Sequence, residues 1–326
     1  MKTIAYIIPY FGKLPKNFPL WLLSCKKNPT VDFILLTNDE TSYQYPFNVK
    51  VIYCTFDSIK KRFQEAFNFN ICIDRPWRLS LFKPAYGEIF TSELVDYDFW
   101  GYCDVDLMWG NIRKFITDEI LDSYERIGTK GHSTLIKNCA KVNRRYRTEI
   151  KGMISYKEVF SGVTNYSFDE NGMDNIYEAL NIKYYFSPNY AHLEKYEPSF
   201  YLKRLPTEKL YTNKYQVFIW KQGNLSRIYL DDDILFSEDY MYIHFFCRPM
   251  NYKIGTLNAE SYIMFPDIVK PYCDELNYNF VKKFGRQNKV RFFMKCLYYN
   301  RKKLTPKHIL INIRNILNYQ CTKQIT

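Results

Sequence analysis

Two aspartates, Asp104 and Asp106, have the most specific chemical meaning of any residues in the sequence. They stand two positions apart, and in extended backbone side chains at this spacing point to the same side. Both carboxylates can therefore approach one divalent cation, and such a cation bridges the two phosphates of a nucleotide diphosphate. A capping or turn role for the pair is the alternative.

The Asp-x-Asp spacing alone is a weak signal, because it recurs in this chain. It occurs at Asp96/Asp98, Asp104/Asp106 and Asp231/Asp233. Only the middle pair directly follows a predicted buried strand, at residues 99–103. Carboxylates at the C-terminal end of a central strand lie where open α/β sheets bind ligands. The other two pairs flank predicted loops, and we expect them to be solvated.

Two histidines are candidates for the same site. His244 lies in the apolar segment 240–246, and a neutral imidazole there is a candidate third ligand for the cation. A hydrogen-bonded core histidine is the alternative. His132 is by the same logic a candidate for contact with a sugar, whereas His192 and His308 have no supporting context.

The acidic pair Asp169 and Glu170 precedes Asn171-Gly172, near the start of a predicted helix. A sugar hydroxyl that attacks an anomeric carbon needs a base to take its proton, and a carboxylate is adequate for that. Acids at a helix N-terminus are also favoured by the helix dipole. The sequence does not choose between these roles, nor between the two residues.

The segment 75–87 sets cations among aromatic residues just before a predicted helix. Arg78 and Lys83 are candidates to neutralise a diphosphate, which needs fixed positive charge as a leaving group departs. A solvated loop whose Trp77 packs into the core is the alternative.

The elements that position these residues alternate between strand and helix. Strands are predicted at residues 4–9, 31–37, 49–55 and 99–103, with helices around 18–25, 58–69 and 82–94. This alternation predicts an α/β fold with a mostly parallel central sheet and flanking helices. Further strands are predicted at 134–136, 184–186, 217–220 and 240–246, a turn at Gly223-Asn224, and a helix at 174–180.

Composition excludes several classes of protein. With 47% hydrophobic residues among 326, the chain is globular. It has no apolar stretch long enough to span a membrane, and its N-terminus is too short in apolar residues for a secretory signal. The nine cysteines form no CxxC pair, which favours a reducing cytosol. P-loop, G-x-G-x-x-G, G-x-S-x-G and zinc-spacing motifs are absent.

The positive charge is concentrated in the C-terminal tail. Residues 276–326 contain twelve of the 46 Lys and Arg residues and no acid, which leaves 34 basic and 34 acidic residues in positions 1–275. A neutral body argues against a fold that coats nucleic acid. Two amphipathic helices are predicted in the tail, around 290–298 and 309–317. We therefore expect one catalytic domain, 1–275, and a basic helical appendix, 276–326.

Several sequence blocks, in this order, resemble a known family. They are I-I-P-Y-F-G, T-N-D, W-R-L-x-x-F-K-P-A-Y-G-E-I-F, W-G-Y-C-D-V-D-L-M-W-G-N-I-R, G-H-S-T-L-I-K-N, F-D-E-N-G and Y-I-H-F. Together they resemble small bacterial glycosyltransferases of the GT-A type, found among enzymes that assemble capsule and O-antigen polysaccharides. The resemblance covers roughly residues 3–250.

The resemblance implies a nucleotide-sugar donor, usually a uridine diphosphate sugar, and Mn²⁺ or Mg²⁺ held by Asp104 and Asp106. It implies a hexosyl group, with galactosyl or galactofuranosyl as candidates, and an inverting mechanism with Asp169 or Glu170 as base. The base and ribose would be held at two strand ends. These donor-binding residues are Pro9, Tyr10, Phe11, Gly12, Thr37, Asn38 and Asp39. The Asn171-Gly172-Met173 that follows the acids departs from a recognisable family motif.

Such enzymes commonly use glycan acceptors tethered to a polyprenyl lipid, so the resemblance also gives the tail a purpose. Residues 281–326 would hold the protein on the anionic inner face of the bacterial membrane. Packing of the tail on the body or on another subunit is the alternative. Two other functions compete with glycosyl transfer, a sugar nucleotidyltransferase and a non-catalytic carbohydrate- or RNA-binding module. A sugar nucleotidyltransferase would need a Gly-rich loop after the first strand, which this chain lacks. A binding module of this kind leaves the paired aspartates unexplained.

Overall fold

The computed structural model describes residues 1–186, 189–193, 200, 213–254, 259–273, 276–286 and 289–301, and all structural statements below concern these. Its central sheet has the strand order β3-β2-β1-β4-β7-β6. The strands are β1 Ile4–Tyr10, β2 Val31–Thr37, β3 Val49–Tyr53, β4 Phe99–Cys103, β6 Arg126–Lys130 and β7 Ser133–Lys137. Strands β1 to β4 run parallel to one another, and β7 runs antiparallel to both of its neighbours, β4 and β6. The predicted α/β fold with a mostly parallel sheet is confirmed.

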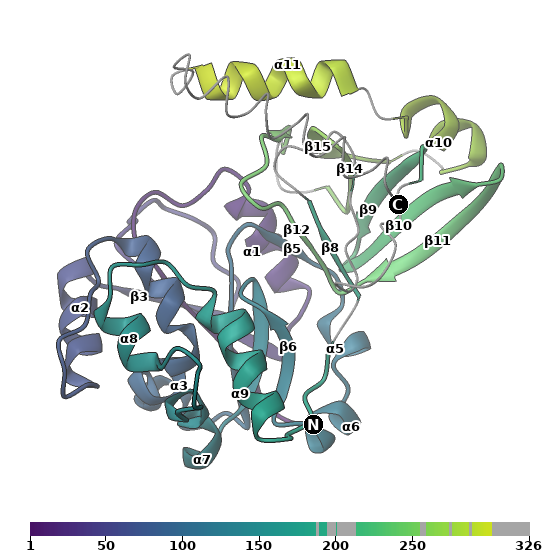
Figure 1. Ribbon diagram of the computed structural model, residues 1–326. Coiled ribbons are helices and arrows are strands. Elements are labelled where there is room, and N and C mark those ends of the chain that lie inside the picture. The colour runs from purple at the N-terminus through teal and green to yellow at the C-terminus, as the bar shows by residue number, and fades with distance from the viewer. Residues whose placement is uncertain are drawn as a thin grey trace.

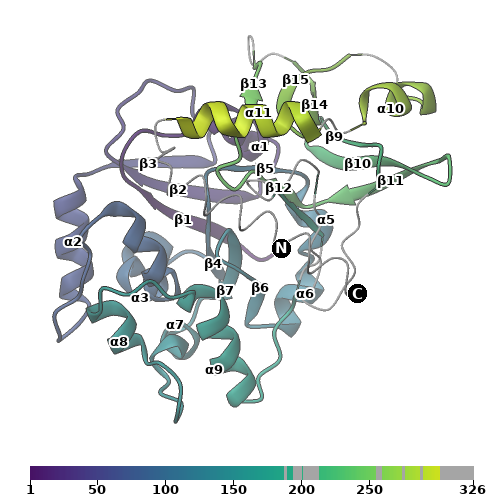
Figure 2. The ribbon, with the colours of Figure 1, turned by 45° about the horizontal axis from the view of Figure 1, so that its top comes forward.

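Both faces of this sheet are buried, which explains why its strands read as continuous apolar runs. Along β1, Ala5 and Ile7 face one core, whereas Ile4, Tyr6 and Ile8 face the other. Figures 1 and 2 show the helices that cover the two faces.

The first face is covered by α2 Phe56–Glu65, α3 Tyr86–Ile89, α4 Thr91–Leu94, α7 Ala140–Asn143, α8 Tyr156–Ser161 and α9 Met173–Ala179. The second is covered by α1 Phe18–Lys26, α5 Ile112–Phe115 and α6 Asp118–Ser123. Short 3₁₀ helices occur at Pro76–Ala85 and Arg145–Arg147, and a π-turn at Phe168–Gly172.

Two predicted elements differ in the structure. The single helix expected at 82–94 is instead the 3₁₀ helix Pro76–Ala85 followed by α3 and α4. Pro84 lies inside this stretch and has no N–H to donate to an α-helical ladder. The strand expected at 184–186 is reduced to one bridge between Tyr185 and Ile127.

A second sheet, largely antiparallel, has the order β11-β10-β9-β14-β15-β13. Its strands are β9 Gln216–Lys221, β10 Asn224–Asp231, β11 Ile234–Tyr240, β13 Asn251–Tyr252, β14 Ser261–Phe265 and β15 Ile268–Pro271. Figure 1 shows it apart from the helices α2 and α8. The indole N–H of Trp220 donates to the carbonyl of Trp109 at 2.7 Å, which ties this sheet to the α/β body.

A small sheet lies between the two large ones and is built from β5 Leu107–Trp109, β12 Tyr242–His244 and β8 Tyr190–His192. Strand β5 begins directly after Asp106, so it links the central sheet to this one. In the register of β12, His244 stands opposite Leu107 on one side and opposite His192 on the other. The small sheet therefore brings residues from two distant segments, β8 and β12, beside the two aspartates.

The described C-terminal residues form α10 Tyr278–Phe284 and α11 Lys289–Asn300. The second helix predicted in the tail, around 309–317, lies outside the described residues. Val281 of α10 is buried in a cluster with Val217 and Ile263. Within the part of the chain that the structure describes, no helix combines the length and apolarity needed to cross a bilayer.

Candidate active site

The candidate site lies at the carboxyl ends of the parallel strands. In the order β3-β2-β1-β4, the strands after β1 are added first on one side of it and then, with β4, on the other side. This reversal of strand order makes the place between β1 and β4 a topological switch point, where open α/β sheets bind ligands. Residues 9–12 end β1, residues 37–39 end β2, and Asp104 follows β4. Strand β7 begins at the same edge, where the N–H of Asp104 donates to the carbonyl of His132 at 3.2 Å.

The two aspartates converge on one nitrogen of His244. Its Nε2 lies 3.2 Å from Oδ1 of Asp106 and 3.8 Å from Oδ2 of Asp104. One ligand atom from each of these three residues lies within 4.8 Å of the others. The Asp104 and Asp106 side chains are 37% and 21% exposed, so solvent reaches the carboxylates, whereas His244 is buried.

A strained loop fixes the orientation of Asp106. Phe246 and Cys247 both have positive φ, at 45° and 51°, a conformation uncommon for residues with a side chain. This bend directs the N–H of Cys247 to Oδ2 of Asp106 at 3.1 Å. Burial alone raises the pKa of Asp106, but His244 and the Cys247 N–H outweigh it and hold that pKa below its usual value.

Lys83 supplies a buried positive charge beside the aspartates. Its Nζ donates to Oδ1 of Asp104 at 2.7 Å and to the carbonyl of Gly131 at 2.8 Å. Burial alone lowers the pKa of Lys83, but the carboxylates of Asp104 and Asp169 outweigh it and raise the pKa above its usual value. The ammonium is therefore held protonated at the carboxyl end of strand β4.

The acidic pair Asp169 and Glu170, in the segment Phe168–Gly172, also lies beside these residues. Glu170 accepts the Gly131 N–H at 2.8 Å and pairs with Lys130 at 3.4 Å. Asp169 is buried, and its carboxylate lies against Gly131, where a Cβ would meet its Oδ2. Burial raises the pKa of Asp169 to about 6, and Lys83 works against this rise. The structure thus separates two neighbouring acids, one ion-paired and one desolvated.

This separation predicts a pH-dependent stability change for Asp169→Asn in chelator-treated protein. The pKa of Asp169 is about 6 in the folded chain and 3.8 in the unfolded chain, so its ionisation costs stability as pH rises through 6. Two pKa units correspond to about 3 kcal/mol. The Asn variant should therefore melt above the wild type at pH 8 and level with it at pH 4.

Thermal unfolding at several pH values measures this difference, with Glu170→Gln as the control. Glu170 is partly exposed and already paired, so its amide variant should show no gain that grows with pH. An Asp169→Asn variant equally shifted at pH 4 and pH 8 would contradict the assignment of the buried charge.

Gly131→Ala is a second prediction from the same cluster. A Cβ at position 131 would contact Oδ2 of Asp169, and this short buried side chain has little room to move. The substitution should displace the Asp169 carboxylate and lower any activity that needs it about tenfold or more, because misplacing a catalytic group by 1 Å costs up to roughly 100-fold. Turnover and melting temperature should be measured together. Gly152→Ala is the control for backbone strain: a Cβ there meets no atom within 4 Å, but the φ of 82° disfavours alanine, so this variant should lose stability and keep its turnover. Loss of stability without loss of turnover in Gly131→Ala would count against the prediction.

The ends of β1 and β2 hold each other through polar side chains. Asn38 accepts the Gly12 N–H at 2.8 Å, and Asp39 accepts the Leu14 N–H at 2.9 Å. Asp39 also pairs with Lys13, while the Thr41 hydroxyl is the largest cause that holds its pKa well below the usual range. Gly12 has φ of 106°, which glycine adopts without strain.

The remaining residues expected at the donor lie at the same edge. Pro9 and Tyr10 are partly buried at the end of β1, Phe11 is buried against Phe56, and Thr37 is buried with its hydroxyl accepting the Asp39 N–H. The pKa of Tyr10 is raised, first by burial and then by the Asp106 carboxylate. These residues therefore lie together at the carboxyl ends of β1 and β2, with Tyr10 near Asp106.

Arg78 does not join this cluster. Its guanidinium is fully buried and donates to the carbonyls of Cys72, Gly162 and Val163. The guanidinium N–H groups that a diphosphate would need therefore already donate to backbone carbonyls. The expectation that Arg78 neutralises a leaving group is therefore corrected: it stabilises the junction between residues 72 and 162–163, and Lys83 alone of the two faces the aspartates.

Two members of the cluster have no sequence signal that would single them out. His192 contacts His244 with its Nδ1 2.9 Å from the other Nδ1, because β8 and β12 pair in register. Cys247 acts through its backbone N–H, which no residue type encodes. Only the pairing of remote strands brings His192 to the site.

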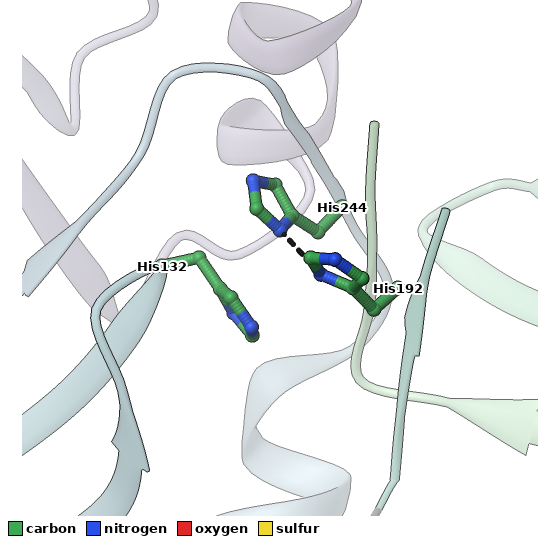
Figure 3. Close-up of side chains that lie close together, drawn as sticks. All are labelled: His132, His192 and His244. Carbon is green, nitrogen blue, oxygen red and sulfur yellow. Dashed lines mark hydrogen bonds between the residues drawn. The ribbon is translucent and has the colours of Figure 1, made fainter. Parts of the chain in front are cut away.

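His132, expected at a sugar, is instead packed among aromatic rings. Its Nδ1 lies 2.9 Å from the Tyr242 hydroxyl, and its ring centroid lies 4.4 Å from that of His244. Burial lowers the pKa of His132 well below 6.5, so the ring is neutral. Figure 3 shows His132, His192 and His244 facing one another.

The fold and the site together define a mixed α/β protein with a cluster of acids, histidines and one lysine at the switch point of its main sheet. The chain belongs to DUF6625, a family of unknown function, whose sequence profile matches residues 6–272. No curated protein shows significant sequence similarity to it.

Two solved structures with partial similarity are glycosyltransferases. One is galactosyltransferase LgtC in complex with donor and acceptor sugar analogs, at 15% identity over 58% of this chain and 75% of that chain, with a TM-score of 0.33. The other is the apo form of mouse xyloside xylosyltransferase 1, at 12% identity over 59% and 88%, with a TM-score of 0.36. Both TM-scores are below 0.5.

Proposed function

We propose that the chain is a metal-dependent glycosyltransferase that uses a nucleotide diphosphate sugar, with a uridine diphosphate hexose as the expected donor. The observation that carries the proposal is the convergence of Asp104, Asp106 and His244 beside the Lys83 ammonium, at the sheet edge where ligands bind. A nucleotide diphosphate needs this combination, because two negative phosphates must be neutralised while one bond to them breaks.

The three ligand atoms fit a divalent cation of intermediate hardness. Two carboxylate oxygens and one imidazole nitrogen suit Mn²⁺, and Mg²⁺ accepts the same oxygens. Asp104, Asp106 and His244 would hold the ion, and the Cys247 N–H would keep Asp106 oriented toward it. When bound, the cation supplies positive charge for the diphosphate. Added Mn²⁺ would also compete with Lys83 for Asp104.

The protein's own residues would handle the proton and the leaving group. In the proposed step the acceptor hydroxyl attacks the anomeric carbon, its proton passes to a carboxylate, and the sugar–phosphate bond breaks with its electron pair on the diphosphate. Asp169 is the proposed base, since Glu170 is already paired with Lys130 and the Gly131 N–H. Lys83 would stabilise the departing charge. Attack from the face opposite the diphosphate would invert the anomeric centre.

The strand ends would hold the nucleotide. Residues 9–12 and 37–39 lie at the ends of β1 and β2, and Asp104, which pairs with Lys83, follows the neighbouring strand β4. The base and ribose are proposed to lie at the ends of β1 and β2, and the diphosphate beside Asp104 and Lys83. The acceptor is proposed to be a glycan, carried by a polyprenyl lipid in the assembly of a bacterial surface polysaccharide.

Thermal shift with nucleotide diphosphates tests this proposal. Uridine diphosphate with Mn²⁺ should raise the melting temperature. At a ligand concentration 100 times Kd, the free energy of unfolding should increase by about 2.7 kcal/mol. Either component alone should raise it less, because the ion links the protein to the phosphates. Greater stabilisation by a nucleoside triphosphate than by uridine diphosphate, each with the metal, would favour a nucleotidyltransferase, and no stabilisation by any nucleotide would overturn the proposal.

The C-terminal helices are proposed to hold the protein at an anionic membrane. Several apolar residues of α11 lie exposed within a segment that has basic residues and no acid. They are Val290, Phe293, Met294 and Tyr298, at 49–74% exposure. An amphipathic basic helix of this kind binds anionic surfaces through both its charge and its apolar face.

Deleting residues 289–326 should release the protein from anionic vesicles. Each basic residue near such a surface contributes about 1 kcal/mol, so three of them account for roughly a 100-fold change in partition. The cut spares α10, because Val281 is buried in the body. Co-sedimentation at moderate salt measures the partition, with uncharged vesicles as the control. Unchanged sedimentation of the shortened chain would contradict the prediction.

A further inference from the structure

Three of the four histidines in the chain lie together in one cluster. His132, His192 and His244 each offer a ring nitrogen, and these nitrogens lie within 4.8 Å of one another. The ring centroids are 4.4 Å apart for His132 and His244, 4.9 Å for His192 and His244, and 5.5 Å for His132 and His192. Figure 3 shows that the three come from different segments of the chain. The function proposed above uses only His244.

The backbone holds this cluster in a fixed geometry. His192 and His244 are register partners in the paired strands β8 and β12. His132 directly precedes β7, and its Nδ1 lies at hydrogen-bond distance from the hydroxyl of Tyr242, two residues before His244. When His132 donates from Nδ1 to that hydroxyl, its Nε2 is left with a lone pair. Metal-binding histidines commonly use their second nitrogen in this way.

The distances suit a transition metal better than a hard cation. Zinc binds imidazole at 2.0–2.1 Å in tetrahedral geometry, which sets ligand nitrogens roughly 3.3 Å apart. The Nδ1 atoms of His192 and His244 are 2.9 Å apart, so a small outward shift accommodates the ion. Imidazole suits Zn²⁺, whereas carboxylates suit Mn²⁺ and Mg²⁺.

We propose that His132, His192 and His244 form a second metal site, which prefers Zn²⁺ over Mn²⁺ and opposes metal binding at Asp104 and Asp106. The two sites use opposite nitrogens of His244. Its Nε2 faces Asp106 at 3.2 Å, and its Nδ1 faces His192 at 2.9 Å.

The opposition follows from the proton on the His244 ring. A neutral imidazole has one lone pair and one N–H. When Zn²⁺ takes the lone pair on Nδ1, the proton is on Nε2 and points at Asp106. The aspartate site then loses its imidazole ligand. When Mn²⁺ takes the lone pair on Nε2, the proton on Nδ1 points at His192 and the zinc site loses a ligand in turn.

X-ray absorption of the wild-type protein with one equivalent of Zn²⁺ tests the ligand set directly. Three imidazoles in the zinc shell are expected, with no need for donor, acceptor or turnover. One imidazole with two carboxylate oxygens would overturn the proposal, because it would place zinc at the aspartates. This measurement needs no variant, and its result does not depend on whether the chain transfers sugar.

Calorimetric titration of two matched variants supplies the second test. His192→Gln removes one zinc ligand and keeps an oxygen that accepts the His244 N–H, so Zn²⁺ affinity should fall at least roughly 100-fold and Mn²⁺ affinity much less. Asp104→Asn with Asp106→Asn should do the reverse. One equivalent of Zn²⁺ should weaken Mn²⁺ binding in the wild type and not in His192→Gln. Zinc affinity unchanged in His192→Gln, in protein with a normal melting curve, would overturn the proposal.

Discussion

Replacing Asp104 and Asp106 together by asparagine is expected to remove metal-dependent transfer. The two carboxylates converge on Nε2 of His244 and form the hard part of the proposed ligand set. A bound cation contributes several kcal/mol of charge stabilisation, so losing it should lower kcat/KM by about 1,000-fold or more. Stability should fall, because Asp104 is the ion-pair partner of the buried Lys83 and the lowered pKa of Asp106 means that its carboxylate stabilises the fold.

The experiment compares turnover of a uridine diphosphate sugar, with and without Mn²⁺, in the wild type and the double variant. The double variant Asp231→Asn with Asp233→Asn is a matched control with the same spacing. Asp231 ends β10, and Asp233 lies in the turn before β11. That pair should leave metal-dependent turnover unchanged. If the variant at 104 and 106 keeps its Mn²⁺-dependent rate, the aspartates are not the metal site.

Lys83→Met is expected to have the second largest effect. The ammonium pairs with Asp104, donates to the Gly131 carbonyl and faces Asp169. Removing a preorganised charge of this kind typically costs 100- to 1,000-fold in rate, and we expect roughly 100-fold in kcat. Since Lys83 lowers the pKa of Asp169, its loss should also move the acidic limb of the pH–rate profile upward from about 6.

The pH profile separates this role from simple loss of structure. Lys83→Arg should retain part of the rate and leave the acidic limb near its wild-type position, because the charge remains. Lys50→Met is the control: Lys50 pairs with Asp32 at 3.0 Å away from the site, and its loss should change neither rate nor profile. A wild-type profile in Lys83→Met would show that Lys83 does not act on Asp169.

The parallel half of the main sheet is predictable from the sequence because its strands are buried on both faces. Such strands read as apolar runs, and all four were predicted within three residues at either end. The position of Asp104 after β4 follows from the same reasoning. The strand 126–130 was not predicted, since it contains Arg126, Lys130 and a glycine and has little apolar pattern.

The composition of the site was less predictable, because it depends on contacts between remote segments. His192 stands at the end of a three-residue strand with no pattern of its own, and only its pairing with β12 brings it to His244. Arg78 is the opposite case, a residue that the sequence assigns to the site and the structure does not. Its neighbours in the sequence suggest an anion site, yet its guanidinium is used up by backbone carbonyls of a loop more than 80 residues away. Residue type alone does not distinguish these two outcomes.

The order in which the ligands occur along the chain affects when the site can form during synthesis. Asp104 and Asp106 leave the ribosome long before His244, which pairs with a strand that itself follows Asp106. A nascent chain that has folded its parallel sheet therefore presents two carboxylates without their imidazole partner. We expect a growing polypeptide to bind divalent ions weakly and to gain a tight site only when β12 joins β5.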